Sequence, residues 1–317
     1  MLNRHLSVPS FAKINLSLRV LGKRPDGYHE VQTVLHTVSL HDSLHFAATC
    51  DPEINFSCED AAIPQDRANL VVKAAEALRE HYNVKVGARV QLEKRIPVQA
   101  GLGGGSSNAA ITLLALSRLW ELPATHEELV QIGSELGADV PFFLTGGCAL
   151  ATGIGTTLTE LPSLPQQRIL IVAPLAKVAT ANAYKALEAP ALTTLTAASI
   201  LASSRTQSIF SDSEQWALCD HLENDFERVI FDMEPEIRRV KEALMQAGAR
   251  CALLAGSGSS VFGIFDNDDV LGVAAHSLYN ESVWQNFSCV TLSRDEYLHA
   301  IGSAIPGRRT KDSDTGA

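Results

Sequence analysis

The chain has 317 residues, of which 46% are hydrophobic and 20% charged, and its formal net charge is -10. This length is sufficient for two packed domains with a buried core. The acidic balance argues against general affinity for nucleic acid or an anionic membrane, because both require a basic surface. An anionic ligand would therefore have to be held by a local arrangement of donors.

The six cysteines show neither a C-x-x-C pair nor a histidine at zinc-ligand spacing, so we expect reduced, mostly buried thiols and no metal site. They are Cys50, Cys58, Cys148, Cys219, Cys251 and Cys289. The first residues lack an uninterrupted apolar segment, and no stretch reaches the roughly 18 apolar residues of a membrane-spanning helix. These features predict a cytoplasmic protein.

The first segment with a clear period is residues 11–20, FAKINLSLRV, where apolar and polar side chains alternate. Strict alternation is typical of a strand with one buried and one exposed face. Lys13 falls on the polar face, where a solvated surface lysine is the ordinary outcome. Residues 30–48 predict two more strands.

Leucine and alanine at helical spacing predict a helix over residues 67–82, with Asp66 or Asn69 as its N-cap. Residues 87–99 alternate again and predict a strand that leads into a glycine-rich loop. A helix is expected to follow this loop, from about residue 106 to residue 120.

A second helix is predicted from residue 126 to residue 136, ending at Gly137. Residues 145–155 contain several glycines and predict a strand or hairpin. Asp139 lies between these segments among apolar neighbours, and two interpretations are open for it. It is either a cap for the next turn or a buried functional carboxylate.

The second half repeats the mixture of strands and helices. Residues 168–174 predict a short buried strand and residues 180–187 a short helix. A further helix begins at Pro235 and ends before Gly248. Residues 251–265 predict a strand, a glycine turn and another strand, and the turn sequence GSGSS is by itself typical of an ordinary hairpin.

The proline-rich residues 161–167 mark a boundary, which divides the chain into predicted domains at 1–160 and 161–303. Residues 191–215 are weakly patterned and are expected to form a surface helix or loop. The polar residues 304–317 are expected to be a disordered tail.

The glycine-rich loop, PVQAGLGGGSSNAA, places four glycines in five positions. Such a run indicates positive φ angles or a close approach to the backbone. It matches neither common nucleotide pattern, because no lysine follows the glycines and Ser106 stands where G-x-G-x-x-G needs its last glycine. Free N–H groups followed by a helix N-terminus still predict phosphate binding. The alternative is a tight loop that lets the helix pack closely on the sheet.

Four stretches in this order, AKINLSL, GLGGGSSNAA, LGADVPFF and GSGSSVFG, resemble the galacto-, homoserine-, mevalonate- and phosphomevalonate-kinase (GHMP) superfamily. The resemblance covers nearly the whole chain apart from the tail. It implies an α+β, two-domain fold with the active site in the cleft between the domains. Residues 12–42 are most similar to the branch that phosphorylates the 2-hydroxyl of 4-diphosphocytidyl-2-C-methyl-D-erythritol, in the non-mevalonate route to isoprenoid precursors.

The resemblance also implies roles for individual residues. Asp139 is the expected catalytic carboxylate and Lys13 its partner, and Mg²⁺ is expected to be held mainly by ATP, without a dedicated metal site. The ATP phosphates would be bound by Pro97, Val98, Gln99, Ala100, Gly101, Leu102, Gly103, Gly104, Gly105, Ser106 and Ser107. The other substrate would be bound by Asn15, Tyr28, His29, Thr180, Tyr184 and Ser257.

The rings of Tyr28 and Tyr184 are expected on the two sides of the cytosine, with His29 reading the edge of the base. Tyr184 stands where the family often has phenylalanine, and Ala100 stands where glycine is also common. Both departures leave the expected chemistry in place.

Three other functions remain open at this point. Another small-molecule kinase of the superfamily, of homoserine or mevalonate type, would share the phosphate loop but not the segment RPDGYHE. A non-catalytic, ligand-sensing regulator on the same fold need not keep Lys13 and Asp139. A Rossmann-type oxidoreductase is disfavoured by the glycine pattern. The expected partners are small molecules, and the expected state is a monomer or a homodimer.

Overall fold

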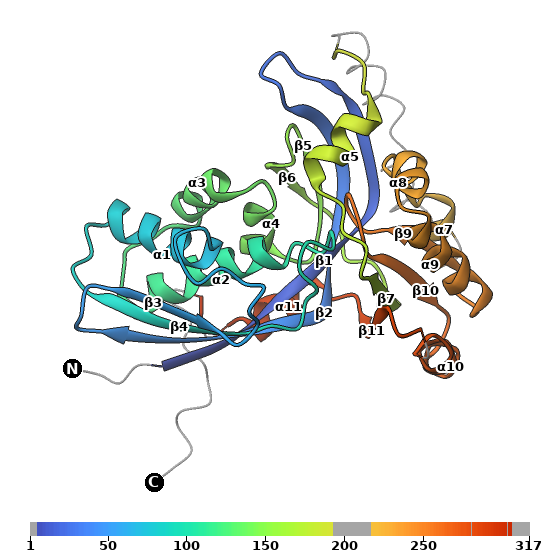
Figure 1. Ribbon diagram of the computed structural model, residues 1–317. Coiled ribbons are helices and arrows are strands. Elements are labelled where there is room, and N and C mark those ends of the chain that lie inside the picture. The colour runs from blue at the N-terminus through green and yellow to red at the C-terminus, as the bar shows by residue number, and fades with distance from the viewer. Residues whose placement is uncertain (1–4, 193–216, 280, 303, 306–317) are drawn as a thin grey trace.

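The computed structural model describes residues 5–192, 217–279, 281–302 and 304–305 (Figure 1). Residues 193–215 of the segment 191–215, which is predicted as a surface helix or loop, lie outside these residues, as does most of the predicted tail. Within the described residues, no helix is long and apolar enough to cross a membrane.

Two long antiparallel strands form the centre of the molecule, β1 (His5–Lys23) and β2 (His29–Thr49). The prediction of two strands over 30–48 is wrong, because β2 is one continuous strand of 21 residues. Register shifts, for example between Phe11 and Ala12 of β1, let the pair bend while pairing continues. A register shift of this kind interrupts the alternation of apolar and polar side chains in the sequence, although the strand continues.

These two strands belong to a seven-stranded sheet in the order β3-β4-β2-β1-β8, with β5 paired to β2 and β6 to β5. The remaining strands of this sheet are β3 (Ile54–Cys58), β4 (Gly87–Glu93), β5 (Cys148–Thr152), β6 (Thr157–Glu160) and β8 (Glu223–Asn224). Strand β5 lies within residues 145–155, where a strand or hairpin is predicted, and β6, its hairpin partner, lies just beyond this segment. Strand β4 ends six residues before the predicted position, at Glu93.

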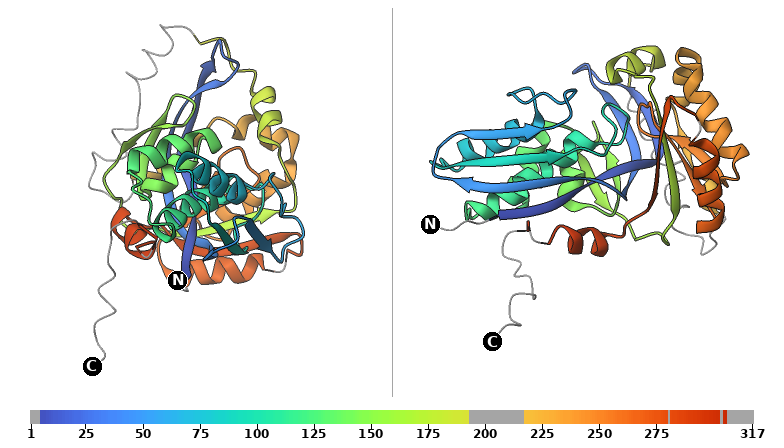
Figure 2. Two further views of the ribbon diagram at one scale, coloured as in Figure 1. Left: turned by 90° about the vertical axis from the view of Figure 1, so that its left-hand side faces the viewer. Right: turned by 60° about the horizontal axis from the view of Figure 1, so that its bottom comes forward.

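Four helices pack against one face of the larger sheet, behind the strands in the right-hand view of Figure 2. They are α1 (Leu70–His81), α2 (Gly104–Leu119), α3 (His126–Leu136) and α4 (Val140–Thr145). The N-cap of α1 is Asn69, one of the two predicted caps, and α3 ends at Gly137 as predicted. Apolar side chains of these helices form the first core with Leu44, Phe46 and their neighbours in the sheet.

The second sheet has four strands in the order β11-β7-β10-β9, with helices α8, α9 and α10 along its outer side (Figure 1). Its strands are β7 (Arg168–Pro174), β9 (Cys251–Leu254), β10 (Val261–Phe265) and β11 (Trp284–Val290). The helices of this half are α5 (Thr180–Leu187), α7 (Ala217–Asp220), α8 (Glu227–Met233), α9 (Pro235–Gln246) and α10 (Asp268–Leu278). The strands at 168–174 and 251–265 and the helices at 180–187 and from Pro235 confirm the predicted elements.

A third core joins the two sheets. Ile14 and Leu16 of β1 pack in one cluster with Ile169 of β7 and Phe262 of β10. The apolar face of β1 is therefore covered by the second sheet. After β11 the chain returns to the first half, where Tyr297 of α11 (Arg294–Ala300) is fully buried in the first core. The division of the chain at residue 160 stays a prediction.

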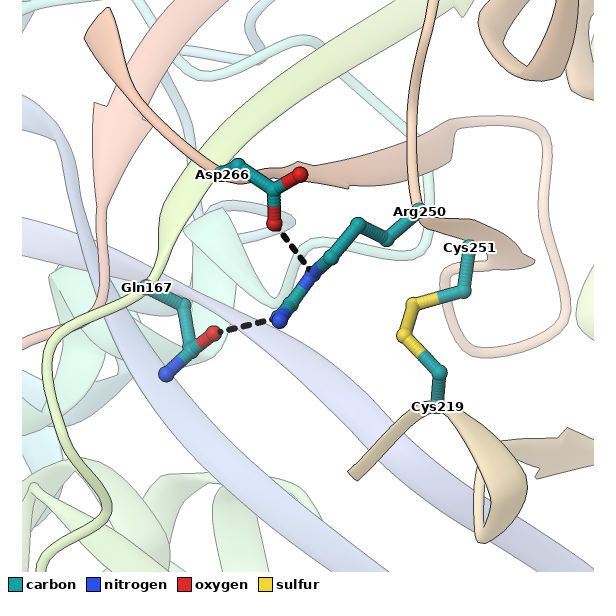
Figure 3. Close-up of a disulfide and its surroundings, with 5 residues drawn as sticks. All are labelled: Gln167, Cys219, Arg250, Cys251 and Asp266. Atoms are coloured by element: carbon teal, nitrogen blue, oxygen red, sulfur yellow. Dashed lines mark hydrogen bonds and ion pairs between the residues drawn. A yellow bond between two sulfur atoms is a disulfide. The ribbon is translucent and has the colours of Figure 1, made fainter. Parts of the chain in front are cut away.

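The cysteine prediction needs a correction. Cys219 of α7 and Cys251 of β9 form a disulfide across 32 residues of sequence, beside the Arg250 side chain that binds Gln167 and Asp266 (Figure 3). A separation of this size leaves no local spacing signal, which is why the prediction of reduced thiols is wrong for this pair. Of the other four cysteines, Cys58, Cys148 and Cys289 are buried and Cys50 is exposed.

Candidate active site

A cleft of about 1130 Å³ opens between β1, the hairpin end of β2, the glycine-rich loop and helix α5. Eleven of the predicted site residues line it, namely Lys13, Asn15, Tyr28, His29, Gly101, Gly103, Ser106, Asp139, Thr180, Tyr184 and Ser257. The structure thus brings together the predicted catalytic pair, every predicted residue of the second substrate site and part of the loop.

The other predicted loop residues do not line this cleft: Pro97, Val98, Gln99, Ala100, Leu102, Gly104, Gly105 and Ser107. Two of them, Ala100 and Leu102, belong to the core that joins the sheets. Ser107 is fully buried, and its hydroxyl accepts a hydrogen bond of 2.7 Å from Ser10. Their predicted contribution to ATP binding would come through the backbone or through the shape of the loop.

The side chain of Lys13 is buried rather than solvated, which corrects the ordinary interpretation of a lysine on a polar strand face. The residue is 5% exposed. Its Nζ donates to Asn15 Oδ1 at 2.8 Å and lies 3.6 Å from Asp139 Oδ2. The ammonium group is therefore held between a neutral acceptor on its own strand and a carboxylate from the start of α4.

The amide of Asn15 is oriented by a further pair of hydrogen bonds. Its Nδ2 donates to Thr33 Oγ1 at 2.7 Å, and that hydroxyl donates to the carbonyl of Ser17 at 2.6 Å. Because the Thr33 hydroxyl donates its only proton to a carbonyl, it can only accept a hydrogen bond from Asn15. The amide oxygen must then face Lys13.

Asp139 occupies the N-cap position of α4, but its side chain makes no capping hydrogen bond. Its carboxylate is 35% exposed. Of the two interpretations left open by the sequence, turn capping by the side chain is therefore not observed. The carboxylate faces the cleft, opposite Lys13.

The glycine-rich loop combines left-handed backbone with close contacts. Gly101 and Gly103 have φ angles of 79° and 72°. A Cβ on Gly101 would lie 1.9 Å from the carbonyl oxygen of Ala255, and one on Gly103 would lie 2.8 Å from the ring of Phe143. Both glycines therefore pack closely against neighbouring groups. Gly103 is the N-cap residue of α2, and no side chain caps the first turn of this helix. Uncapped N–H groups at a helix start suit an anionic ligand.

Aromatic rings form the far wall of the cleft. His29 stacks on Tyr184 with ring centroids 4.6 Å apart, and Phe226 meets Tyr184 edge-on at 4.9 Å. Tyr28 is 62% exposed at the rim. Phe226 was not predicted, because no feature of its local sequence distinguishes it from a core phenylalanine.

Burial, assisted by the charge of Asp139, raises the pKa of Tyr184 to about 12. Burial and the nearby Lys23 lower the pKa of His29. At neutral pH the phenol is therefore protonated and the imidazole is neutral, with one donor and one acceptor nitrogen. Next to this wall, the hydroxyls of Thr180 and Ser257 lie 3.1 Å apart.

No group of three or more His, Cys, Asp and Glu side chains in the described ranges is arranged to hold a metal ion. Ser106 is the hydroxyl of the α2 start that lines the cleft. It can supply one oxygen ligand to a cation that a nucleotide brings with it.

Comparison with known proteins matches two family models, the GHMP kinases N terminal domain over residues 69–147 and the GHMP kinases C terminal over residues 211–282. A 4-diphosphocytidyl-2-C-methyl-D-erythritol kinase of Exiguobacterium sibiricum is 40% identical over 269 residues, which is 85% of this chain and 91% of the relative. The enzyme of that name from Bacillus cereus is 38% identical over 275 residues, 87% of this chain and 92% of its own.

Solved structures give the same grouping. The crystal structure of a 4-(cytidine 5'-diphospho)-2C-methyl-D-erythritol kinase matches with a TM-score of 0.73 and 32% identity, over 90% of this chain and 99% of the other. A homoserine kinase from Cytophaga hutchinsonii matches with a TM-score of 0.69 at 18% identity, over 90% of this chain and 95% of its own. At that identity, the match to the homoserine kinase shows a shared fold alone.

Proposed function

The chain belongs to the GHMP kinase family, and on that premise we propose that it transfers the γ-phosphoryl group of ATP to the 2-hydroxyl of 4-diphosphocytidyl-2-C-methyl-D-erythritol. The observation that carries the proposal is the ion pair of Lys13 and Asp139 at the mouth of the glycine-rich loop, in a cleft that also has an aromatic wall. This arrangement supports a phosphate site at the glycine-rich loop and a base at Asp139. The product would be an intermediate of the non-mevalonate route to isoprenoid precursors.

In this reaction Asp139 accepts a hydrogen bond from the acceptor hydroxyl, which directs an oxygen lone pair at the γ-phosphorus. The new P–O bond forms as the bond to the β-phosphate oxygen breaks, which releases ADP, and the proton of the hydroxyl passes to the Asp139 carboxylate. Lys13, fixed by Asn15, places one positive charge where negative charge develops on the transferring group. A buried ammonium is effective in this role because little water screens it.

The ATP phosphates are proposed to lie against the loop 97–107 and the start of α2. Mg²⁺ bound to the nucleotide supplies charge neutralisation for the transferring phosphoryl group. Ser106, which lines the cleft at the start of α2, would supply one oxygen ligand to that ion. The positive end of the α2 dipole acts in the same direction.

The cytosine is proposed to bind at the aromatic wall, between Tyr28 and Tyr184. The neutral His29 offers a donor and an acceptor to the edge of the base, which rejects a base with the wrong pattern by leaving buried groups unpaired. For a base to enter between the rings, His29 has to leave its stack on Tyr184. The cytoplasmic location expected from the sequence stays a proposal. We also propose that the enzyme acts as a monomer or a homodimer, since one chain supplies every side chain used here.

The test is a coupled assay of ATP turnover with the purified protein against 4-diphosphocytidyl-2-C-methyl-D-erythritol, homoserine, mevalonate and galactose. We expect turnover with the cytidylyl compound alone. Turnover with homoserine or mevalonate and none with the cytidylyl compound would contradict the substrate and leave the kinase family in place.

The same assay tests the catalytic pair. We expect Asp139→Asn and Lys13→Ala each to lower kcat by on the order of 10²-fold or more, with a much smaller effect on ATP binding. Asp295→Asn, at an exposed position of α11 outside the cleft, is the matched control and should keep the parent kcat. A folded Asp139→Asn protein with near-normal kcat would remove that carboxylate from the mechanism.

A further inference from the structure

A fully buried carboxylate lies beneath the glycine-rich loop, outside the cleft. Asp42 of β2 is 0% exposed, and its partner Lys94 has a side chain that is 9% exposed. Lys94 Nζ donates to Asp42 Oδ2 at 2.9 Å and to Oδ1 at 3.1 Å. Neither residue lines the cleft, and the proposed mechanism uses neither of them.

The other donors to Asp42 come from both ends of the loop. The backbone N–H groups of Arg95 and Ile96, where the chain leaves β4, each donate to Oδ1 at 2.8 Å. Asn108, in the second turn of α2, donates through Nδ2 to Oδ2 at 3.0 Å. One carboxylate therefore fixes the two points between which residues 97–107 are suspended.

The neighbouring strand makes a parallel connection. Ser10 of β1 is the register partner of Asp42 in β2, and its hydroxyl donates to Ser107. Adjacent positions of the two central strands thus hold adjacent residues of α2. The start of this helix is tied to the strand pair that also carries Lys13.

Asp42 also determines where a positive charge lies. Its partner Lys94 additionally donates to the carbonyl of Ile96, and its Nζ lies 3.4 Å from where a Cβ on Gly104 would be. The ammonium is thereby held against the first residue of α2. Because burying an ion pair costs about as much as the pair returns, its main effect is on geometry rather than on net stability.

We propose that Asp42 is a positioning residue for the nucleotide, which holds the two ends of the phosphate loop and the Lys94 ammonium in the arrangement that binds ATP. The inference rests on the proposed function in one respect, that residues 97–107 bind the ATP phosphates. It does not depend on which alcohol is phosphorylated. A loop that is already ordered before ATP binds loses less conformational entropy on binding, so its affinity for ATP is higher.

The experiment measures the Kd of Mg·ATP by calorimetry for the full chain carrying Asp42→Asn, together with the KM values for ATP and for the alcohol. The substitution removes the charge partner of Lys94 and exchanges one acceptor oxygen for a donor. We expect the Kd and the KM for ATP to rise about tenfold or more, and the KM for the alcohol to change less than twofold.

A second variant covers the case in which Asp42→Asn does not fold, because it leaves a buried ammonium without its counter-charge. Asn108→Ala removes only the connection to α2 and keeps the Asp42–Lys94 pair. We expect this variant to raise the Kd for ATP by a smaller factor, about threefold. The double variant Asp42→Asn/Asn108→Ala should raise the Kd by less than the product of the two single effects.

The matched control is Glu227→Gln in α8. Glu227 also combines a lysine partner, Lys241 at 2.7 Å, with a backbone donor, Leu254 at 3.0 Å, and it does not line the cleft. It should lower stability without changing the Kd for ATP. A merely structural role for Asp42 would give the same result as this control.

Two results would overturn the inference. The first is a folded Asp42→Asn protein that binds ATP with the parental Kd. The second applies if Asp42→Asn does not fold, and is a folded Asn108→Ala protein that binds ATP with the parental Kd. Because ATP binding is read without the acceptor, a parent protein that binds ATP but fails to phosphorylate the cytidylyl compound would count against the proposed substrate only.

Discussion

Gly103→Ala is the substitution that tests most directly how the glycine-rich loop is built. Gly103 has a φ of 72°, where an L-residue costs about 1–2 kcal/mol. The added Cβ would lie 2.8 Å from the ring of Phe143, and a carbon–carbon contact is ordinarily about 3.5–4.0 Å. Phe143 is fully buried and cannot move freely, so this overpacking adds about 1–3 kcal/mol. Together these terms predict a loss of about 2–5 kcal/mol in the free energy of unfolding.

The same methyl group should also displace Lys13, which is proposed to take part in the reaction. It would lie 3.1 Å from Cγ of Lys13, whose ammonium pairs with Asp139. A displacement of about 1 Å in a catalytic group can cost on the order of 10²-fold in rate. We therefore expect kcat to fall at least about tenfold even in the fraction that is folded.

The assay pairs urea unfolding with steady-state kinetics at saturating ATP and alcohol. Gly272→Ala, at an exposed position of α10 where a Cβ would meet nothing within 4 Å, is the matched control. It should raise stability by about 0.5–1 kcal/mol and leave kcat unchanged. A Gly103→Ala protein with parental stability and kcat would refute both the strain argument and the placement of Lys13 beside the loop.

Three further results are expected. Tyr28→Ala and Tyr184→Ala should each raise the KM for the cytidylyl substrate about tenfold, which corresponds to ~1.4 kcal/mol. The control Tyr184→Phe keeps the ring and should not raise this KM. If the substitutions to alanine raised the KM for ATP instead, the two rings would belong to the adenine site. Burial lowers the pKa of His36 from 6.5 to about 4, so the unfolded chain binds the proton first as the pH falls. Stability should thus drop by about 3 kcal/mol between pH 6.5 and 4, as read from urea midpoints, and His36→Gln should flatten this slope. Cys219→Ser opens a 32-residue loop and should cost about 3–4 kcal/mol, unless thiol titration in denaturant without reductant finds Cys219 and Cys251 already free.

Local patterns predicted the elements whose signals are local. The cap at Asn69, the stop at Gly137 and the proline that begins α9 each act within one helical turn, and the structure confirms them. The alternation in residues 11–20 likewise predicted a strand. It could not predict that the polar face is buried as well, because the groups beside Lys13 on that face, Gly103 and Asp139, are distant in the sequence.

The residues that sequence reasoning missed act over long separations. Asp42 gathers donors from Lys94 to Asn108, and in the sequence it is one acid among many. Phe226 reaches the cleft only because α8 begins beside Tyr184. The early end of β4 has the same origin, since the backbone donors of Arg95 and Ile96 are taken by Asp42 instead of a neighbouring strand.

The two glycine clusters, residues 101–105 and 256–260, are explained by the same contact. The first is a strong sequence signal and the second is by itself typical of an ordinary hairpin, but the two pack against each other. The segment 256–260 is the predicted hairpin turn, but it also packs on the glycine-rich loop. The N–H of Ser260 donates to the carbonyl of Ala100 at 3.2 Å. A Cβ on Gly256 would lie 3.0 Å from the carbonyl oxygen of Gly101 and 3.4 Å from Nζ of Lys13. The backbones of the two loops are therefore in direct contact. Glycine is required at both, because each loop limits the space available to the other beside Lys13.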